Sequence, residues 1–282
     1  MAETPFRVTF LGTGTSTGVP VVGCTCAVCT SSDPRDQRLR CSAYVEVGGL
    51  HIMLDSGPDF RQQALTHRIR QVDAVLITHH HYDHVFGMED LRPFFFYNSA
   101  TLPCFASPLT SDVLRNMFAY IFSDGSYPGI PKLALHPVTE NFVINGRYDA
   151  QTCFPNGDPI QTTNHDQRIE VQPIPVLHGK LPIYGYRIGD FAYLTDTSHI
   201  PESSFHALQG LDVLVLDALR EQPHHSHFSI AQAVQAARRI GARRTYFIHM
   251  THQVLHETIQ AQLPSGMFLA HDGLCIEVEP LS

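Results

Sequence analysis

The sequence has 282 residues, of which 43% are hydrophobic and 16% are charged. These values are typical of a folded protein, and the length is enough for a single domain over 1–282 with its own core. The formal net charge of −8 argues against binding to long nucleic acids. The first residues carry no apolar signal region, and no run approaches the ~20 apolar residues of a membrane span. We therefore expect a cytoplasmic location and no membrane partner.

Apolar and alternating runs predict β-strands in both halves of the chain, with helices between them. Helices are expected over 111–122 and over 229–240, where Ser229 is a suitable N-cap. The least patterned part, about 123–164, is expected to be an irregular insert of strand pairs with a long loop that could overhang the site. The predicted strands are 7–11, 43–47, 50–54, 72–77, 102–106, 168–176, 184–188, 191–194, 211–217, 244–248 and 274–278.

The densest cluster of ionisable side chains is His79, His81, Asp83 and His84, which reads H-x-H-x-D-H. It directly follows the predicted strand over 72–77, and α/β folds place their sites at such strand ends. Four ionisable groups in six positions would repel one another or lose polar partners unless a cation joins them. Imidazole and carboxylate together suit zinc, manganese or iron, so we predict a metal site here. A histidine-rich solvated loop is the alternative.

A second cluster, Cys24, Cys26 and Cys29, follows a glycine-rich loop over 12–20. The chain has seven cysteines, an odd number, and three of them are packed together, which favours metal binding over disulfides. We expect the loop over 12–42 to bind zinc through these thiols and a fourth ligand from elsewhere. Unliganded thiols or a redox pair are the alternatives.

Further polar residues stand at the ends of predicted strands. Asp55 precedes a glycine turn, where an Asx turn is the simple alternative. His178, Asp196 and His249 each end a strand in the second half of the chain. His252 lies three positions after His249 and is the candidate for the fourth zinc ligand beside the cysteines.

At the H-x-H-x-D-H run and these strand ends, the sequence resembles the metallo-β-lactamase superfamily of metallohydrolases, over nearly the whole chain. The resemblance implies an αββα sandwich of two mixed sheets, whereas spacing alone predicts only an α/β fold. It also implies two divalent ions, Mn²⁺ or Zn²⁺, that share a hydroxide. It assigns His79, His81 and His178 to one ion, Asp83, His84 and His249 to the other, Asp196 to both as a bridge, and Asp55 to a supporting position behind the ligands.

The cysteine cluster and the extra His252 narrow the resemblance to PhnP-like phosphodiesterases, which have a dinuclear catalytic centre and a structural zinc. This resemblance puts a catalytic histidine at His227, with His225 as a rival by sequence alone. His227 would donate a proton or a hydrogen bond to the phosphoryl oxygen or the leaving group. Asp83 would orient the hydroxide as well as bind metal. The resemblance also suggests a homodimer.

We therefore expect a metal-dependent phosphodiesterase. Its expected substrates are small, such as ribose cyclic phosphates or 2′,3′-cyclic nucleotides. One alternative is a tRNA 3′-processing endonuclease, although the sequence shows no basic, Gly/Pro-rich arm to hold tRNA. Others are a lactonase or thioesterase, and a PqqB-like non-enzymatic binding protein, although here every ligand position is filled.

Overall fold

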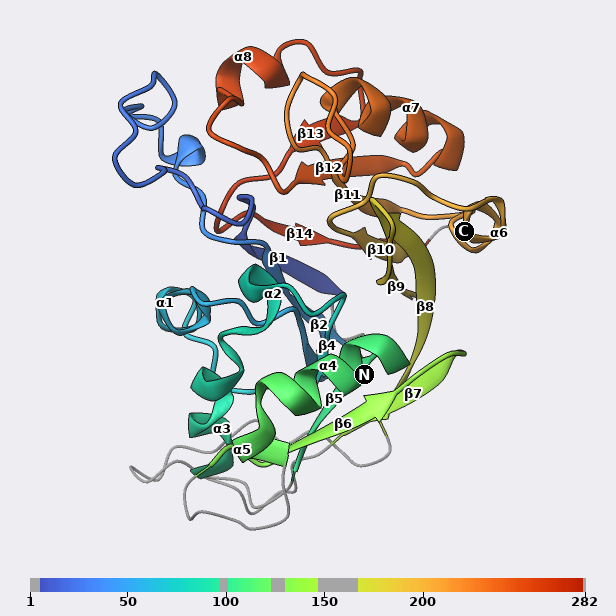
Figure 1. The fold of residues 1–282 in the computed structure, drawn as a ribbon. Coiled ribbons are helices and arrows are strands. Elements are labelled where there is room, and N and C mark those ends of the chain that lie inside the picture. The colour runs from blue at the N-terminus through green and yellow to red at the C-terminus, as the bar shows by residue number, and fades with distance from the viewer. Residues whose placement is uncertain (1–5, 97–100, 123–129, 147–166, 281–282) are drawn as a thin grey trace.

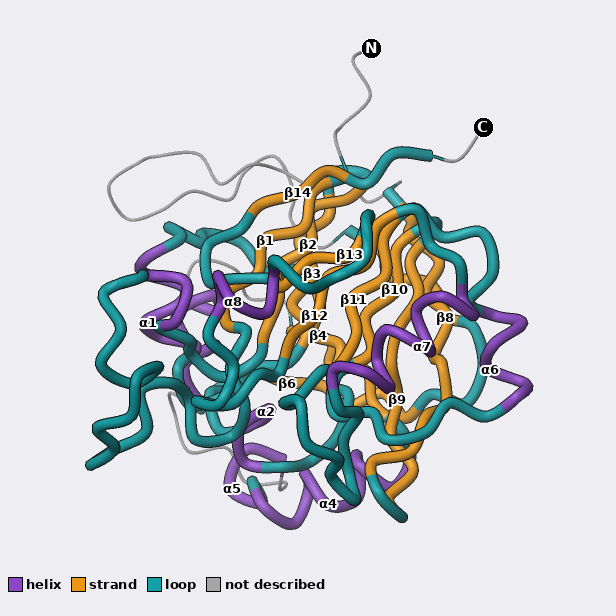
Figure 2. Tube along the Cα trace, turned by 90° about the horizontal axis from the view of Figure 1, so that it is seen from above, coloured by secondary structure: helices purple, strands orange, loops and turns teal. Residues whose placement is uncertain are grey.

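The computed structural model describes residues 6–96, 101–122, 130–146 and 167–280. Two seven-stranded sheets face each other, and helices lie on the outer side of each sheet (Figures 1 and 2). This arrangement is the predicted αββα sandwich, so the expected fold is confirmed.

The first sheet has the order β14-β1-β2-β3-β4-β5-β6. Pairing is antiparallel from β14 to β3 and parallel from β3 to β6, so the sheet is mixed. The parallel strands bring their carboxyl ends to one edge, where the histidine cluster follows β4. The strands are β1 (Arg7–Gly12), β2 (Ser42–Val47), β3 (Leu50–Leu54), β4 (Ala74–Leu76), β5 (Leu102–Ala106), β6 (Leu133–Pro137) and β14 (Cys275–Glu277).

The second sheet has the order β13-β12-β11-β10-β9-β8-β7. It is antiparallel from β7 to β10 and parallel from β10 to β13, which repeats the design of the first sheet. The strands are β7 (Phe142–Asn145), β8 (Arg168–His178), β9 (Leu181–Ile188), β10 (Phe191–Leu194), β11 (Val213–Asp217), β12 (Arg244–Ile248) and β13 (Met267–Leu269).

Most of the helices are short. The longer helix α7 is stabilised at its N-terminus by a capping box. Ser229 accepts a hydrogen bond from Gln232 N–H, and the Gln232 side chain caps Ser229 N–H in return. The apolar stripe of α7 then packs on the second sheet. The helical elements are η1 (Pro34–Asp36), α1 (Phe60–Thr66), α2 (Tyr82–Val85), η2 (Met88–Leu91), α3 (Pro93–Phe96), α4 (Pro108–Met117), α5 (Ala119–Phe122), α6 (Glu202–Ala207), α7 (Ile230–Ile240) and α8 (His256–Gln260). No helix in the described ranges is long and apolar enough to cross a membrane.

The main core lies between the two sheets. Val8, Phe10 and Val45 of the first sheet and Val213 and Val215 of the second are fully buried there. Their spacing of two residues follows from the alternation of side chains along a strand. One further apolar layer lies between each sheet and the helices that cover it. Strands covered on both faces explain why the predicted runs are apolar rather than alternating.

Some predicted elements differ from the structure. The helix expected over 111–122 is two helices, because Phe118, which ends α4, leaves the helical conformation at ψ 43°. The strand pairs expected within 123–164 are β6 and β7, which do not pair with each other: each is the edge strand of a different sheet. The prediction assumed local pairing, whereas each strand is held by a neighbour already in its own sheet. The long loop expected there falls largely on 123–129 and 147–166, outside the described residues.

Candidate active site

Strand ends from both sheets meet at one edge of the sandwich and bring the predicted site residues together. Three of these residues, Asp55, Asp196 and His249, have positive φ angles of 58°, 51° and 64°. Non-glycine residues rarely adopt this conformation, and such strain collects at functional sites. The sharp turn directly after each strand aims the side chain at its neighbours. The strand-end residues are Asp55 after β3, His79 after Thr78 beyond β4, His178 at the end of β8, Asp196 after Thr195 beyond β10, Asp217 at the end of β11 and His249 after β12.

The first ligand group consists of His79, His81 and His178, whose nearest ring nitrogens all lie within 4.8 Å of one another. His178 Nδ1 lies 2.8 Å from the carbonyl oxygen of Ser226, which fixes this nitrogen as a donor and leaves Nε2 free. Burial first, and then the charge of His84, hold the pKa of His79 well below its usual value. His79 is therefore a neutral imidazole, the form that binds metal.

The second group consists of Asp83, His84, Asp196 and His249, and all four are buried. His84 Nε2 lies 3.2 Å from Asp83 Oδ2 and 3.1 Å from Asp196 Oδ2. The other oxygen of Asp196, Oδ1, lies 3.2 Å from His249 Nε2 and 4.0 Å from His79 Nε2. The Asp196 carboxylate therefore stands between the two groups, where the resemblance places a bridging ligand.

Asp55 supports this arrangement from behind. Its Oδ2 lies 2.8 Å from His84 Nδ1, and the carboxylate also accepts hydrogen bonds from the backbone and hydroxyl of Thr78. With Nδ1 committed to Asp55, His84 can present only Nε2 to the ligand group. The structure thus places Asp55 in direct contact with His84, one of the predicted ligands.

Two glycines let the backbone carrying Asp55 approach the helix carrying His84. A Cβ atom on Gly57 would lie 2.0 Å from the carbonyl oxygen of Asp83, and one on Gly87 would lie 2.0 Å from that of Gly57. Both positions therefore require glycine for close backbone packing. Hydrogen bonds from Ser56 N–H to His84 O and from Gly87 N–H to Ser56 O lock the two segments together.

His227 stands beside both ligand groups. Its ring centroid lies 4.6 Å from that of His178 and 4.8 Å from that of His249. Its Nδ1 faces the buried carboxylate of Asp217 at 3.3 Å, so Nε2 is left for a reacting group. Of the two candidates in this loop, His227 lies at the ligand groups, whereas His225 is part of no such group among the described residues.

Asp217 is the one residue of this centre that the sequence analysis did not single out. Besides His227, it lies 3.5 Å from His249 Nδ1 and accepts a hydrogen bond from the backbone N–H of Phe228. The Asp217 carboxylate thus hydrogen-bonds the candidate catalytic histidine and also lies close to a candidate ligand. The sequence does contain a signal for Asp217: like Asp55, it is an acidic residue at the end of a buried apolar strand.

The electrostatics of the second group favour a positive charge at its centre. Burial lowers the pKa of His84 and of His249, but the surrounding carboxylates, Asp196 and Asp83 among them, together outweigh burial and raise both. Burial raises the pKa of Asp83 and of Asp196, but the same two histidines bring both below their usual range. Converging carboxylates therefore demand a cation, either a proton on the imidazoles or a metal ion.

The donor atoms fit divalent metal ions. The nitrogens His79 Nε2, His84 Nε2 and His249 Nε2 are buried; they face the carboxylates of Asp83 and Asp196, but none makes a hydrogen bond of good geometry among the described residues. Buried polar atoms without partners are costly, so their convergence on one space calls for a further binding partner there. Nitrogen and carboxylate donors of this kind suit Zn²⁺ or Mn²⁺.

A separate cluster joins Cys24, Cys26, Cys29 and His252, and all four candidate ligand atoms lie within 4.8 Å of one another. His252 Nδ1 is 3.2, 3.5 and 3.6 Å from the three sulfur atoms in that order. The backbone N–H of Cys29 helps lower the pKa of Cys26 to about 6, whereas burial raises that of Cys29 to about 11. Without a cation the three thiols would not all ionise, but four such donors match a closed zinc site.

The cysteine loop is attached to the second half of the chain by more than this cluster. The buried guanidinium of Arg38 contacts Asp36 Oδ1 at 3.0 Å and donates to the carbonyl oxygen of Val254 at 2.8 Å. Arg35 also forms an ion pair with Glu257 in α8. In Figure 1 the loop, in blue, accordingly lies beside α8.

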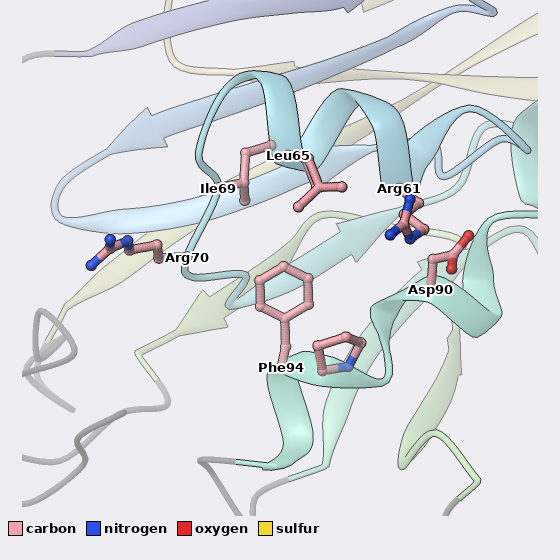
Figure 3. Close-up of a pocket in the computed structure, with 8 residues that line it drawn as sticks. Arg61, Leu65, Ile69, Arg70, Asp90 and Phe94 are labelled. Carbon is pink, nitrogen blue, oxygen red and sulfur yellow. The ribbon is translucent and has the colours of Figure 1, made fainter. Parts of the chain in front are cut away.

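A pocket of about 360 Å³ lies elsewhere, between α1 and α3 (Figure 3). None of the predicted site residues lines it. The apolar side chains of Leu65, Ile69 and Phe94 form its middle. The charged side chains of Arg70 at one end and of Arg61 and Asp90 at the other flank them.

Comparison with known proteins agrees with this geometry. The family described as "Beta-lactamase superfamily domain" matches residues 51–250. A crystal structure described as a new diphosphatase from the PhnP family is 42% identical, with a TM-score of 0.82 and 97% of each chain covered. The chain belongs to the metallo-β-lactamase superfamily, close to the PhnP family. It accordingly has the metallo-β-lactamase fold, and this family implies divalent metal ions.

Two curated relatives carry other names. An octanoyltransferase of Porphyromonas gingivalis is 37% identical over 271 residues, which are 95% of this chain and 51% of that protein. A ribonuclease Z of a Bradyrhizobium species is 32% identical over 129 residues, 44% of this chain and 42% of that protein. The chain thus spans about half the length of the first relative, and the match to the second is partial on both sides.

Proposed function

We propose that the chain is a metal-dependent phosphodiesterase that hydrolyses small phosphodiesters, including cyclic ones, at a dinuclear centre. The observation that carries this proposal is the position of Asp196. One of its oxygens faces His84, and the other faces both His249 and His79. A carboxylate shared in this way suits two cations about 3.5–4 Å apart, which can bind both the attacking and the leaving oxygen of a phosphoryl group.

Each ion would have its own ligands. His79, His81 and His178 would hold one, Asp83, His84 and His249 the other, and Asp196 would bridge them. When bound, divalent ions supply Lewis acidity and lower the pKa of water. Cys24, Cys26, Cys29 and His252 would hold a structural zinc apart from the reaction.

The remaining steps belong to the side chains. Asp83 would orient the attacking hydroxide in line with the departing oxygen. His227, held through Nδ1 by Asp217, would present Nε2 to the phosphoryl oxygen or the leaving oxygen. Burial and then His249 lower the pKa of His227 to about 4. A bound phosphate anion would favour its protonated form, so the ring would become a donor as substrate binds.

A diphosphate is the second candidate substrate, because the 42% identical relative is described as a diphosphatase. In a diphosphate substituted at both ends, each phosphorus carries two bridging oxygens and one negative charge, as in a phosphodiester. The same centre would therefore suit both bonds. The negative net charge of the chain favours a small substrate of either kind over tRNA.

Hydrolysis of an acyl ester or thioester is a third candidate. It is favoured by the name octanoyltransferase, which belongs to a protein of about twice this length. A metal centre that polarises a phosphoryl oxygen can also polarise a carbonyl.

The test is hydrolysis of bis(p-nitrophenyl) phosphate by protein reconstituted with Mn²⁺ or Zn²⁺, beside His81→Ala, His227→Ala and His225→Ala variants. We expect metal-dependent activity that falls at least about a hundredfold in the first two variants and persists in the third. A diphosphate-linked dinucleotide and octanoyl thioesters serve as parallel substrates. A loaded centre that cleaves only the thioesters would contradict the proposal. A centre that binds no metal would indicate a binding protein instead.

A further inference from the structure

Exposed aromatic side chains stand directly beside the candidate ligands. Tyr82 lies in sequence between His81 and Asp83, yet its side chain is 52% exposed, and Phe86 one turn later is 43% exposed. The two ring centroids are 4.4 Å apart. Phe86 in turn packs against Phe118, which is nearly buried, at 5.5 Å. We call Tyr82, Phe86 and Phe118 the aromatic shelf.

One short helix connects the shelf to the candidate active site. In α2 the side chains of Asp83 and His84 are buried among the second ligand group, whereas Tyr82 lies on another side together with Phe86, four residues later. Tyr82 is one peptide unit, about 3.8 Å between Cα atoms, from both His81 and Asp83. The shelf therefore begins on the same short helix that carries Asp83 and His84.

The position of the shelf is fixed rather than adaptable. The backbone around α2 is locked to the Asp55 segment by the close approach of Gly57 and Gly87 and by two hydrogen bonds of Ser56. The backbone that carries Tyr82 and Phe86 is consequently held in place beside Asp83. Such a rigid surface suits a planar ligand better than a flexible chain.

Two exposed aromatic rings that pack on each other offer a flat face on which a ligand can lie. Protein aromatic rings bind unpaired nucleobases by stacking, because every base offers a π-face.

We propose that the aromatic shelf binds the nucleobase of a nucleotide substrate while its phosphoryl group lies at the ligand groups. This inference rests on the proposed phosphodiesterase function and narrows it. The preferred substrates are nucleotides, whether 2′,3′-cyclic or diphosphate-linked, and base-free ribose cyclic phosphates are poorer ones.

The test compares kcat/KM for 2′,3′-cyclic AMP with that for ribose 2,3-cyclic phosphate in the metal-loaded protein. We expect the wild type to prefer the nucleotide. Tyr82→Leu and Phe86→Leu lower the ratio of the two values by about tenfold, mainly through KM for the nucleotide. Tyr82→Phe keeps the ratio, because it keeps the ring. The matched control is Tyr120→Leu: Tyr120 is also 52% exposed, but it lies on α5 and hydrogen-bonds Glu89.

An equal rate with both substrates, or an unchanged ratio in both leucine variants, would overturn the proposal. An equal loss on both substrates, together with a smaller assembly in light scattering, would instead identify the shelf as an interface with a second copy. If the wild type hydrolyses neither substrate, the phosphodiesterase function fails by itself. Calorimetric binding of AMP and of ribose 5-phosphate then decides on the shelf: tighter AMP binding that Tyr82→Leu abolishes supports it, and equal binding overturns it.

Discussion

The carboxylate of Asp55 and the imidazole of His84 form a fully buried pair, with Asp55 Oδ2 2.8 Å from His84 Nδ1. Asp55 directly follows β3 and His84 lies in α2, yet each depends on the other. Asp55 fixes the orientation of His84, and His84 gives the buried carboxylate a charged or polar partner. The position of Nε2 in the second ligand group is therefore set before any metal binds.

Substitution of Asp55 tests this pair. Asp55→Asn can keep the positive φ angle, which asparagine tolerates, but it removes one of the acceptor oxygens that hold His84 and Thr78. We expect metal affinity at the histidine centre to fall by about 10- to 100-fold, measured by competition with a chelator. The surface variant Asp112→Asn serves as control. Equal affinity in both proteins would show that Asp55 does not orient a ligand.

Asp217 is expected to act on catalysis through His227. In Asp217→Asn the carboxylate that faces His227 Nδ1 is lost, so the ring tautomer and the charge of the imidazole are no longer stabilised. We expect kcat to fall by about a hundredfold even with saturating metal. We also expect a shift in the apparent pKa that the pH–rate profile gives for His227. An unchanged profile with only lower metal affinity would assign Asp217 to His249 alone.

The cysteine cluster is expected to hold one zinc ion per chain. Cys26→Ser removes one of four donors, and we expect the zinc content to fall by about one equivalent and the thermal midpoint by about 5 °C. The Arg38 contacts should keep the rest of the sandwich folded. Cys275→Ser, at an exposed cysteine outside the cluster, is the matched control. The same zinc content in all three proteins would refute a zinc site.

His51 predicts a pH dependence of stability that is independent of the metal centre. Burial lowers its pKa to about 4 in the folded protein, from about 6.5 when unfolded. As the pH falls from 6.5 to 4, the unfolded chain therefore takes up a proton before the folded one, and stability is lost in this window. We expect His51→Gln to flatten the profile by about 2–3 kcal/mol at most, measured by urea unfolding at each pH. Identical profiles would show that His51 titrates normally.

The sequence contains most of the candidate site because its residues follow buried strands. His79, His81, Asp83 and His84 were predictable from one local run, and the structure brings them to His178 and His249 from the other sheet. Asp217 was overlooked because a single acidic residue at a strand end has no local partner. Its role depends on two histidines that are close only in the fold.

The fold was predicted less evenly. The buried strands were clear, but their arrangement as two packed sheets came from family resemblance rather than from pattern. β6 and β7 lie close in sequence and yet belong to opposite sheets, which no local signal reveals. The exposure of the Tyr82 ring likewise cannot be read from the H-x-H-x-D-H run.

Anomalous X-ray diffraction from crystals grown with Mn²⁺ and Zn²⁺ tests the central claim most directly. We predict two metal peaks about 3.5–4 Å apart, one beside His79, His81 and His178, the other beside Asp83, His84 and His249, with Asp196 between them. A single peak would contradict the dinuclear centre, and no peak at these residues would contradict the metal-dependent mechanism itself.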